Sequence, residues 1–458
     1  MNGRHAVAIG LLCLLLLGVA ACSRQREPAP NILLITLDTT RTDHMSVYGY
    51  AHDTTPFLRE FAAGATVFTQ AYAAAPATAP SHATLFTSRS PLNHRVVKNA
   101  VRLADRHETL AEMMVDGGYR TAAILSSFVM NAKFGLGQGF EHYNDTLPEH
   151  GSSIHWRQWE GQTVTGGFDR RATAATDLAV TWLEEQRDPA VPFFLFVHYF
   201  DPHDPYDPPG AYAERFQDPA ATDNPVSRMV RGYDGEIAYT DDELRRLFAA
   251  VDRLGLAENT LVIITGDHGE GLMQRGYQYH GAHIFDEAVR VPLLVRWPGH
   301  VQAGRRHEGL VSIADVVPTI RELLGWSSTG MEFHGRSLAR SLLDGMPPAA
   351  AGPVFLYRIP YEPHDEFGVW VDGEKHAVRQ GPWKYVVADD EGTTELYDLT
   401  ADTGEMNNVV SDYPEKAREL AGILAAWREV VTLPDSLTIE PELSDEDVRK
   451  LKSLGYVH

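Results

Sequence analysis

Five continuous apolar segments constrain the fold of this 458-residue chain more than any other feature of its sequence. A strand with one face in water alternates apolar and polar residues, whereas a strand buried on both faces, as in a parallel sheet, is apolar throughout. We therefore predict five buried parallel strands: Ile32 to Leu37, Thr121 to Leu125, Phe193 to Tyr199, Leu261 to Thr265 and Val291 to Val295.

Helical patterns separate several of these segments. Thr109 to Asp116 precedes a Gly-Gly pair that would end a helix, and two longer segments, Ala172 to Gln186 and Asp241 to Leu254, are amphipathic with the 3.6-residue period. Alternating strands and helices predict an α/β fold with a doubly wound, mostly parallel sheet. In such sheets, ligands bind beyond the carboxyl ends of the strands.

Polar residues stand where that rule predicts a site. Asp38 follows the first strand, Asp201 and His203 follow the third, and Asp267 and His268 follow the fourth. Because the carboxyl ends of parallel strands meet at one edge of a sheet, we expect these side chains to lie close together.

A metal site is the chemistry that this arrangement favours. Gly266 and Gly269 allow the strand end to curl, so that Asp267 and His268 can both reach one ion. Asp38 at the same edge either caps a loop or completes the site. One imidazole among the ligands favours zinc or manganese over calcium. We expect one divalent ion, and leave a second possible.

Thr78 is a second feature of interest. Pro80 fits the first turn of a helix, which places Thr78 just before that helix. Backbone donors and the positive end of the helix dipole favour an anion there. The alternative is that Thr78 is an ordinary N-cap residue.

Several motifs resemble, in order and spacing, those of the sulfatase family, which belongs to the alkaline phosphatase superfamily. They are Asn31 to Asp38, Pro80-Ser81, Asp201-Pro202-His203, Gly266-Asp267-His268-Gly269 and Arg290-Val291-Pro292-Leu293, with Glu395 to Leu399, Gly404-Glu405 and Asn407-Asn408 nearer the end. The resemblance runs from about Asn31 to about Val410. It implies an alkaline phosphatase-like fold and metal-dependent hydrolysis of esters.

The departures from that family are informative. Sulfatases carry Cys or Ser, followed by x-Pro-Ser-Arg, and oxidise the first residue to formylglycine; here the first position is Thr78 and the Arg is His82. Oxidation of Thr would give a ketone, which closes off formylglycine chemistry. The second Asp of the first metal motif is Thr39, the Asn of the later motif is His268, and Ser126 to Gly139 replaces the Lys-Trp-His segment.

The resulting set looks more like the phosphodiesterases and phosphoethanolamine transferases of the superfamily, which use a metal-bound Thr as nucleophile. The resemblance therefore implies four metal ligands: Asp38, Thr78, Asp267 and His268. A divalent cation lowers the pKa of bound water from about 15.7 to about 7, and should acidify a Thr hydroxyl in the same sense. Thr78, His203 and His82 form the predicted catalytic set.

Further residues receive roles by resemblance. His203 would face the substrate and protonate the leaving group, unless it is incidental to a Pro-rich turn. His280 and His283 would hold the oxygens of the anion or bind a second metal; the alternative is that they are ordinary surface histidines. Asn99 resembles a substrate-contacting Asn. Glu270, behind the ligands, and Arg290, as a buried partner, are expected to be structural.

These features predict hydrolysis of a sulfate or phosphate ester through a covalent Thr78 intermediate. A formylglycine hydrate releases sulfate by elimination, which a Thr ester cannot do, so a phosphoester is favoured. The substrate would be a small molecule or a glycan or lipid ester. Two alternatives stay open: an envelope transferase similar to the phosphoethanolamine transferases, and a binding protein with an inactive site.

The N-terminus has the pattern of an export segment. Arg4 and His5 precede the apolar run Ala6 to Ala21, and the ending Val19-Ala20-Ala21-Cys22 resembles the lipobox of bacterial lipoproteins. Lipidation at Cys22 would hold the protein in the cell envelope by a lipid anchor alone; an ordinary signal peptide is the alternative. The other cysteine, Cys13, lies in the same segment, so an internal disulfide and a catalytic Cys are excluded from the folded body.

The composition suggests a division of the chain. We predict a signal peptide at 1–21, a tether at 22–30, a catalytic domain at 31–345, a C-terminal α+β subdomain at 346–432 and a tail helix at 433–458. The subdomain contains short alternating runs, Phe367 to Val371, Ala377 to Arg379 and Lys384 to Val387, and then a helical pattern, Tyr413 to Val430; the tail helix is Ser444 to Leu454. A formal net charge of −22 argues against nucleic-acid binding through a basic face.

Overall fold

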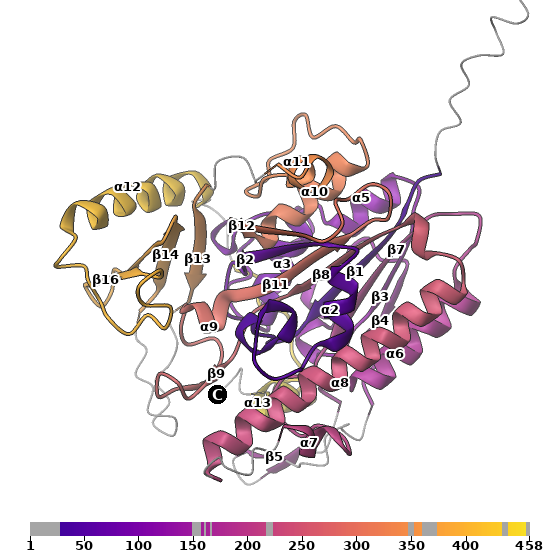
Figure 1. Cartoon of the computed structure of the whole chain (residues 1–458), viewed down its shortest axis with the longest axis horizontal. Coiled ribbons are helices and arrows are strands. Elements are labelled where there is room, and N and C mark those ends of the chain that lie inside the picture. The colour runs from indigo at the N-terminus through magenta and orange to yellow at the C-terminus, as the bar shows by residue number, and fades with distance from the viewer. Residues whose placement is uncertain are drawn as a thin grey trace, which may run out of the picture.

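The structure is a computed structural model that describes residues 28–148, 157–159, 162–164, 167–216, 223–346, 352–359, 373–432 and 438–454. A large sheet forms its centre (Figure 1). In spatial order, its strands are β12 (Arg305–Ser312), β2 (Thr66–Tyr72), β11 (Arg290–Arg296), β8 (Thr260–Gly266), β1 (Asn31–Leu37), β7 (Phe193–Tyr199), β3 (Arg120–Ile124) and β4 (His142–Asn144).

The sheet is mixed and mostly parallel. Strands β8, β1, β7, β3 and β4 run parallel to one another, and β12 runs parallel to β2. Strand β11 pairs antiparallel with both β2 and β8, so the prediction that Val291 to Val295 is a parallel strand was wrong. A continuous apolar run reports burial on both faces and carries no information on direction. Strands β2 and β12 were missed because polar residues interrupt them.

Alternate residues of the central strands supply two separate cores. On β1, Ile32 and Leu34 belong to one core, whereas Leu33, Ile35 and Leu37 belong to the other. The first core packs against α3 (Thr78–Thr87), α5 (Leu110–Asp116), α10 (Val316–Leu323) and α11 (Ala339–Asp344). The second packs against α2 (Pro56–Ala62), α6 (Ala172–Thr181) and α8 (Pro225–Arg253), as Figure 1 shows.

The helices agree with the sequence patterns except in their bounds. A capping box at Thr109 starts α5, and α6 continues into a π-helical turn at Trp182–Gln186. Helix α8 begins at Pro225, 16 residues before the predicted start at Asp241. Two glycines weaken the helical pattern there, and Gly232 has a packing role: a Cβ at this position would lie 2.4 Å from the Tyr206 carbonyl oxygen.

A second, four-stranded antiparallel sheet lies in the C-terminal region. Its order is β13 (Val354–Arg358), β14 (Lys375–Gln380), β15 (Trp383–Ala388) and β16 (Thr393–Asp398), and α12 (Pro414–Val431) covers one face. The predicted run Phe367 to Val371 lies outside the described residues. The predicted tail helix is α13 (Asp445–Ser453), and its Leu451 packs into the first core of the large sheet.

Short elements complete the described chain. They are α4 (Pro91–His94), β5 (Arg157–Trp159), β6 (Gln162–Val164), α7 (Tyr212–Arg215), β9 (Gly271–Leu272), β10 (Gln278–Tyr279) and α9 (Asp286–Val289), with brief 3-10 turns between. Within the described residues, none of the helices combines the length and the apolar character needed to cross a bilayer.

A buried ionic cluster connects the two sheets. The Nζ of Lys384, on β15, lies 3.1 Å from Asp286 Oδ1 and 2.8 Å from Glu405 Oε1. The backbone N–H of Asp286, where α9 begins, donates to Glu405 Oε2 at 2.6 Å. The C-terminal region therefore fixes the start of the helix that leads into β11.

Candidate active site

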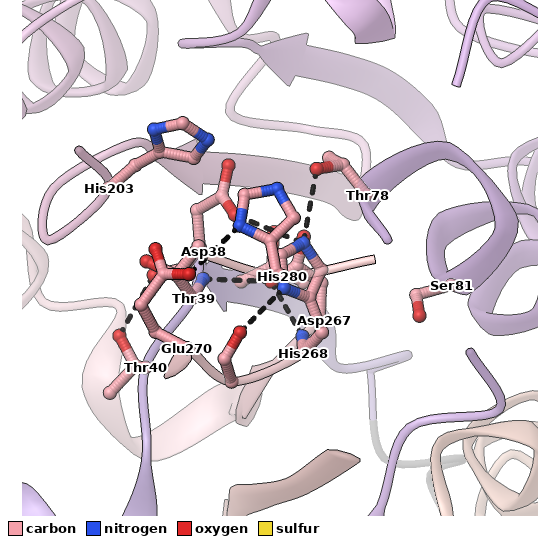
Figure 2. Close-up of polar contacts among 12 residues, drawn as sticks. Asp38, Thr39, Thr40, Thr78, Ser81, His203, Asp267, His268, Glu270 and His280 are labelled. Atoms are coloured by element: carbon pink, nitrogen blue, oxygen red, sulfur yellow. Dashed lines mark hydrogen bonds and ion pairs between the residues drawn. The ribbon is translucent and has the colours of Figure 1, made fainter. Parts of the chain in front are cut away.

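Three side chains meet at the carboxyl ends of β1 and β8, as the sequence predicts. Leu37 pairs with Gly266, so the next residues, Asp38 and Asp267, stand side by side. The Nε2 of His268 lies 3.5 Å from Asp38 Oδ1 and 3.6 Å from Asp267 Oδ2 (Figure 2). All three side chains are buried.

The geometry of this group fits a divalent cation. His268 donates from Nδ1 to the Gly269 carbonyl oxygen at 2.9 Å, so its Nε2 lone pair faces the two carboxylates. Both oxygens of Asp38 and the Oδ2 of Asp267 have no hydrogen-bond partner within the described residues. Buried polar atoms are nearly always paired, so these oxygens are available to bind a cation. Two carboxylates and one imidazole suit zinc or manganese.

Burial dominates the electrostatics of these acids. It raises the pKa of Asp38 to about 7, with Glu270 adding to the shift and His268 opposing it. The pKa of Asp267 is raised as well, first by burial and then by the neighbouring Asp38. A cation bound between the two carboxylates would supply the positive charge that their buried, ionised forms need.

Thr78 lies against this group from the first turn of α3. Its Oγ1 is 3.2 Å from His268 Nε2, and the side chain is fully buried. The prediction that Thr78 stands just before the helix was wrong: it is the first helical residue, Ala77 is the N-cap, and no side-chain cap bond forms. The Thr78 hydroxyl therefore has no capping role and faces the candidate ligands.

Asn99 braces the same helix end. Its Oδ1 accepts the backbone N–H of Ala79 at 2.8 Å, so this helix donor, expected to be available to an anion, is already used. The Nδ2 of Asn99 is buried and has no partner within the described part of the chain. That amide is thus able to donate to a substrate oxygen.

Thr39 adopts a strained backbone conformation beside Asp38. Its φ is 51°, a left-handed value that is unusual for a β-branched residue. The Tyr233 hydroxyl donates to the Thr39 carbonyl at 2.6 Å and accepts from the Arg41 N–H at 2.9 Å, which holds this turn in place. Strain of this kind clusters at functional sites, where the surroundings compensate for it.

Two further histidines lie close to the acids. His82, one turn after Thr78, donates from Nδ1 to the Thr78 carbonyl at 2.8 Å, and its Nε2 lies 3.0 Å from Thr36 Oγ1. His198, near the end of β7, places Nε2 3.4 Å from Asp38 Oδ2. Burial lowers the pKa of His82 to about 3 and that of His198 to about 4, so both rings are neutral near pH 7.

Sequence reasoning missed His198, because we read its strand as uniformly apolar. The signal was available: Phe194, Phe196 and His198 alternate on one face of β7, and the last of them lies opposite Thr36 on β1. A single imidazole at the active-site end of that row departs from the apolar pattern.

His203 and His280 form a pair of neighbouring rings next to His268. His203 stacks on Phe200 at 4.3 Å and donates from Nδ1 to the Asp204 carbonyl at 2.7 Å, which leaves Nε2 as the acceptor nitrogen. Its ring centroid is 5.0 Å from that of His280. His280 packs 4.4 Å from His268 and places Nδ1 3.1 Å from Glu270 Oε1 (Figure 2).

Three other sequence candidates lie elsewhere. Asp201, which follows β7, binds Arg171 at 2.8 Å and accepts the Ala172 N–H at 2.8 Å, so it fixes the start of α6. His283 packs on aromatic rings, Tyr277 at 4.3 Å and Phe285 at 5.2 Å. Arg290 donates to the Thr69 carbonyl at 2.7 Å, in keeping with the structural role expected for it.

The chain matches the sequence models of two known protein families. The sequence model of the sulfatase family matches residues 30–326, and the model for the C-terminal part of N-sulphoglucosamine sulphohydrolase matches residues 276–426. The ulvan-active sulfatase of Formosa agariphila is 26% identical over 86% of this chain and 79% of its own length.

Solved structures share the fold. BT4656, in complex with its substrate D-glucosamine-2-N,6-O-disulfate, has a TM-score of 0.75 at 20% identity, covering 89% of this chain and 99% of that one. The phosphonate monoester hydrolase of Agrobacterium radiobacter has a TM-score of 0.70 at 24% identity, covering 91% and 99%. The chain belongs to the sulfatase family, whose members hydrolyse sulfate ester bonds.

Proposed function

We propose that this protein hydrolyses sulfate or phosphate esters with Thr78 as nucleophile, and that phosphoesters are the better substrates. One observation carries the proposal: Thr78 Oγ1 lies 3.2 Å from His268 Nε2, beside the orphaned oxygens of Asp38 and Asp267. A hydroxyl in that position has no cap bond to lose and is oriented by a candidate ligand.

Asp38, Asp267, His268 and the Thr78 hydroxyl would hold one divalent cation, zinc or manganese before calcium. When bound, such an ion lowers the pKa of an adjacent hydroxyl and offsets negative charge on the substrate. This donor set fits the role, because its unpaired oxygens and its lone-pair nitrogen converge.

Individual side chains of the site then carry out the separate steps of the reaction. Thr78 releases its hydroxyl proton to water, its Oγ1 forms a bond to phosphorus or sulfur, and the bond from that atom to the leaving oxygen breaks. His203 acts in its cationic form: Nδ1–H binds the Asp204 carbonyl, Nε2–H gives its proton to that oxygen, and water later cleaves the Thr78 ester. Glu270 orients His280 beside His203, and the Asn99 amide holds an oxygen of the substrate.

The preference for phosphoesters rests on chemistry. A formylglycine hydrate can eliminate sulfate, whereas a Thr ester must be hydrolysed at sulfur or phosphorus. The fold is compatible with both chemistries, since its structural neighbours include one named for a disulfated glucosamine and one for phosphonate monoesters. We propose a small-molecule or glycan ester as substrate. Because the overall charge of −22 repels an anionic ester, local groups in the site must bind its negative charge.

The location remains part of the proposal. Cys22 and the segment before it lie outside the described residues, and the lipobox-like ending is the only argument for an anchor in the cell envelope. A lipid at Cys22 would give membrane attachment without a spanning helix.

A substrate panel tests the proposed activity. Purified protein with zinc or manganese is assayed on an aryl sulfate, a phosphate monoester, a phosphodiester and a phosphonate monoester. Intact-mass measurement after an acid quench should show a covalent adduct on the best substrate, localised to Thr78 by peptide mapping. Turnover without Thr78 modification, in protein quenched at steady state with a slow-hydrolysing substrate, would contradict the nucleophile.

A further inference from the structure

The unexplained group in this site is His198. Its side chain is fully buried, yet neither ring nitrogen has a hydrogen-bond partner within the described residues. Buried polar atoms are usually paired, and a neutral imidazole always carries one N–H to satisfy. Its Nε2 faces the orphaned Oδ2 of Asp38 at 3.4 Å.

Each of the two acids faces histidines on two sides. Asp38 directs Oδ1 to His268 at 3.5 Å and Oδ2 to His198 at 3.4 Å. The Oδ2 of Asp267 lies 3.6 Å from His268 Nε2 and 3.7 Å from His82 Nδ1. The donors thus form two trios that share Asp267.

Both trios have the dimensions of a metal site. One is Asp38, Asp267 and His268; the other is His82, His198 and Asp267, and in each the ligand atoms lie within 4.8 Å of one another. Carboxylates shared by two cations are common where metals lie about 3.5–4 Å apart. The second trio has two imidazoles and one carboxylate, a donor set for zinc rather than for calcium.

We propose that the protein binds a second divalent cation, zinc by preference, between His82, His198 and Asp267, with Asp38 Oδ2 beside it. The proposal extends the proposed function, because it adds this ion to the one at His268. Binding at His82 Nδ1 replaces the bond to the Thr78 carbonyl; the proton moves to Nε2, which then donates to Thr36 Oγ1. The ion therefore lies between the first turn of α3, which carries Thr78, and β7, which carries His198.

The test counts ions. Metal-free full-length protein is dialysed against buffered zinc and analysed by mass spectrometry of the metal and by calorimetry. We expect about two zinc ions per chain, falling to about one in His198→Phe, which continues the Phe194–Phe196 row, and in His198→Asn. Saturation of the wild type at one ion, or two ions in both folded variants, would overturn the proposal.

A spectroscopic measurement detects the shared carboxylate. With manganese loaded to saturation, the wild type should give the electron paramagnetic resonance signal of an exchange-coupled pair, and His198→Asn the signal of an isolated ion. An uncoupled signal in the wild type contradicts the shared Asp267. Because the assay does not use turnover, an active enzyme with a single ion would refute this inference and leave the proposed function intact.

The chain offers a matched control. His94 is also buried, but its Nε2 lies 3.1 Å from Thr84 Oγ1 and its Nδ1 accepts from the Val96 N–H at 3.1 Å. His94→Asn should keep the wild-type stoichiometry. If His94→Asn and His198→Asn lost zinc equally, the loss would reflect a general effect of removing buried histidines, and the proposed site would be wrong.

Discussion

The hydroxyl of Thr78 and the Nε2 of His268 lie 3.2 Å apart, although 190 positions separate the two residues in the chain. Helix α3 brings the first and the end of β8 brings the second. Thr78→Ala should therefore lower kcat/KM by several orders of magnitude, while stability changes by about 1 kcal/mol, the net value of one hydrogen bond. Steady-state kinetics and thermal melts measure the two effects.

Thr78→Ser serves as the companion variant. It keeps the oxygen and removes only the methyl group, so it should retain part of the activity and the same metal content. If Thr78→Ala hydrolysed the best substrate at a near-normal rate, Thr78 would not be the nucleophile.

His203→Ala should affect poor leaving groups far more than good ones. An acid that protonates the departing oxygen matters little for 4-nitrophenyl esters and contributes about 10²–10⁴-fold for alkyl esters. The measurement is the slope of log kcat/KM against leaving-group pKa, which should steepen in the variant. An equal loss across the series would instead indicate that His203 only positions the substrate.

Metal removal should reveal the buried acid at position 38. In metal-free protein the pKa of Asp38 is raised to about 7, so the folded state keeps a proton that the unfolded chain releases above about pH 4. Stability from this group is present below pH 4 and is lost as the pH rises to 7, by up to about 4 kcal/mol. The measurement is urea unfolding of metal-free wild type and Asp38→Asn across this pH range. The free energy of unfolding should fall more for wild type than for the variant. Equal falls in the two proteins would contradict the raised pKa of Asp38.

His334 offers a pH test away from the active site. Its Nδ1 accepts the Ser90 N–H at 2.9 Å, and burial lowers its pKa to about 4. The folded state therefore favours the neutral ring: this contribution is complete above about pH 6.5 and is lost as the pH falls to 4, by up to about 3 kcal/mol. His334→Asn keeps a hydrogen-bond acceptor that does not titrate, so its melting temperature should fall less than that of wild type as the pH is lowered. Equal acid sensitivity would contradict the assignment.

Cys22→Ala tests the proposed anchor. If a lipid at Cys22 holds the protein to a membrane, this change should move it from the membrane fraction to the soluble fraction after expression in a bacterium that processes lipoproteins. Cys13→Ala is the control, since that residue lies inside the predicted signal peptide. An unchanged distribution would refute the lipobox interpretation.

The sequence predicted that Asp38 and Asp267 lie close together, because their positions follow from strand ends. Asp38 and Asp267 directly follow β1 and β8, and adjacent parallel strands must bring such residues together. The direction of β11 could not be predicted, since burial on both faces makes either direction equally apolar. The helix position of Thr78 was predicted to within one residue, which is the usual uncertainty at a helix end.

Residues that act across the sheet were harder to recognise. His198 is hidden inside an apolar strand, and its meaning depends on Thr36 and Asp38 on the neighbouring strand. Asp201 has the strand-end position of a ligand, yet it forms an ion pair with the partly exposed Arg171. Local sequence cannot distinguish a carboxylate that meets a metal from one that meets an arginine.

The contacts of Lys384 also bear on how this chain can be recombined with others. The segment from His268 through His280 is tied to the sheet at β8 and, at its far end, to Asp286, which Lys384 and Glu405 hold. A crossover near residue 346 would keep Asp286 from one parent and take its two partners from the other. Working chimeras should therefore inherit the three residues as a set, so the C-terminal sheet is not an exchangeable module.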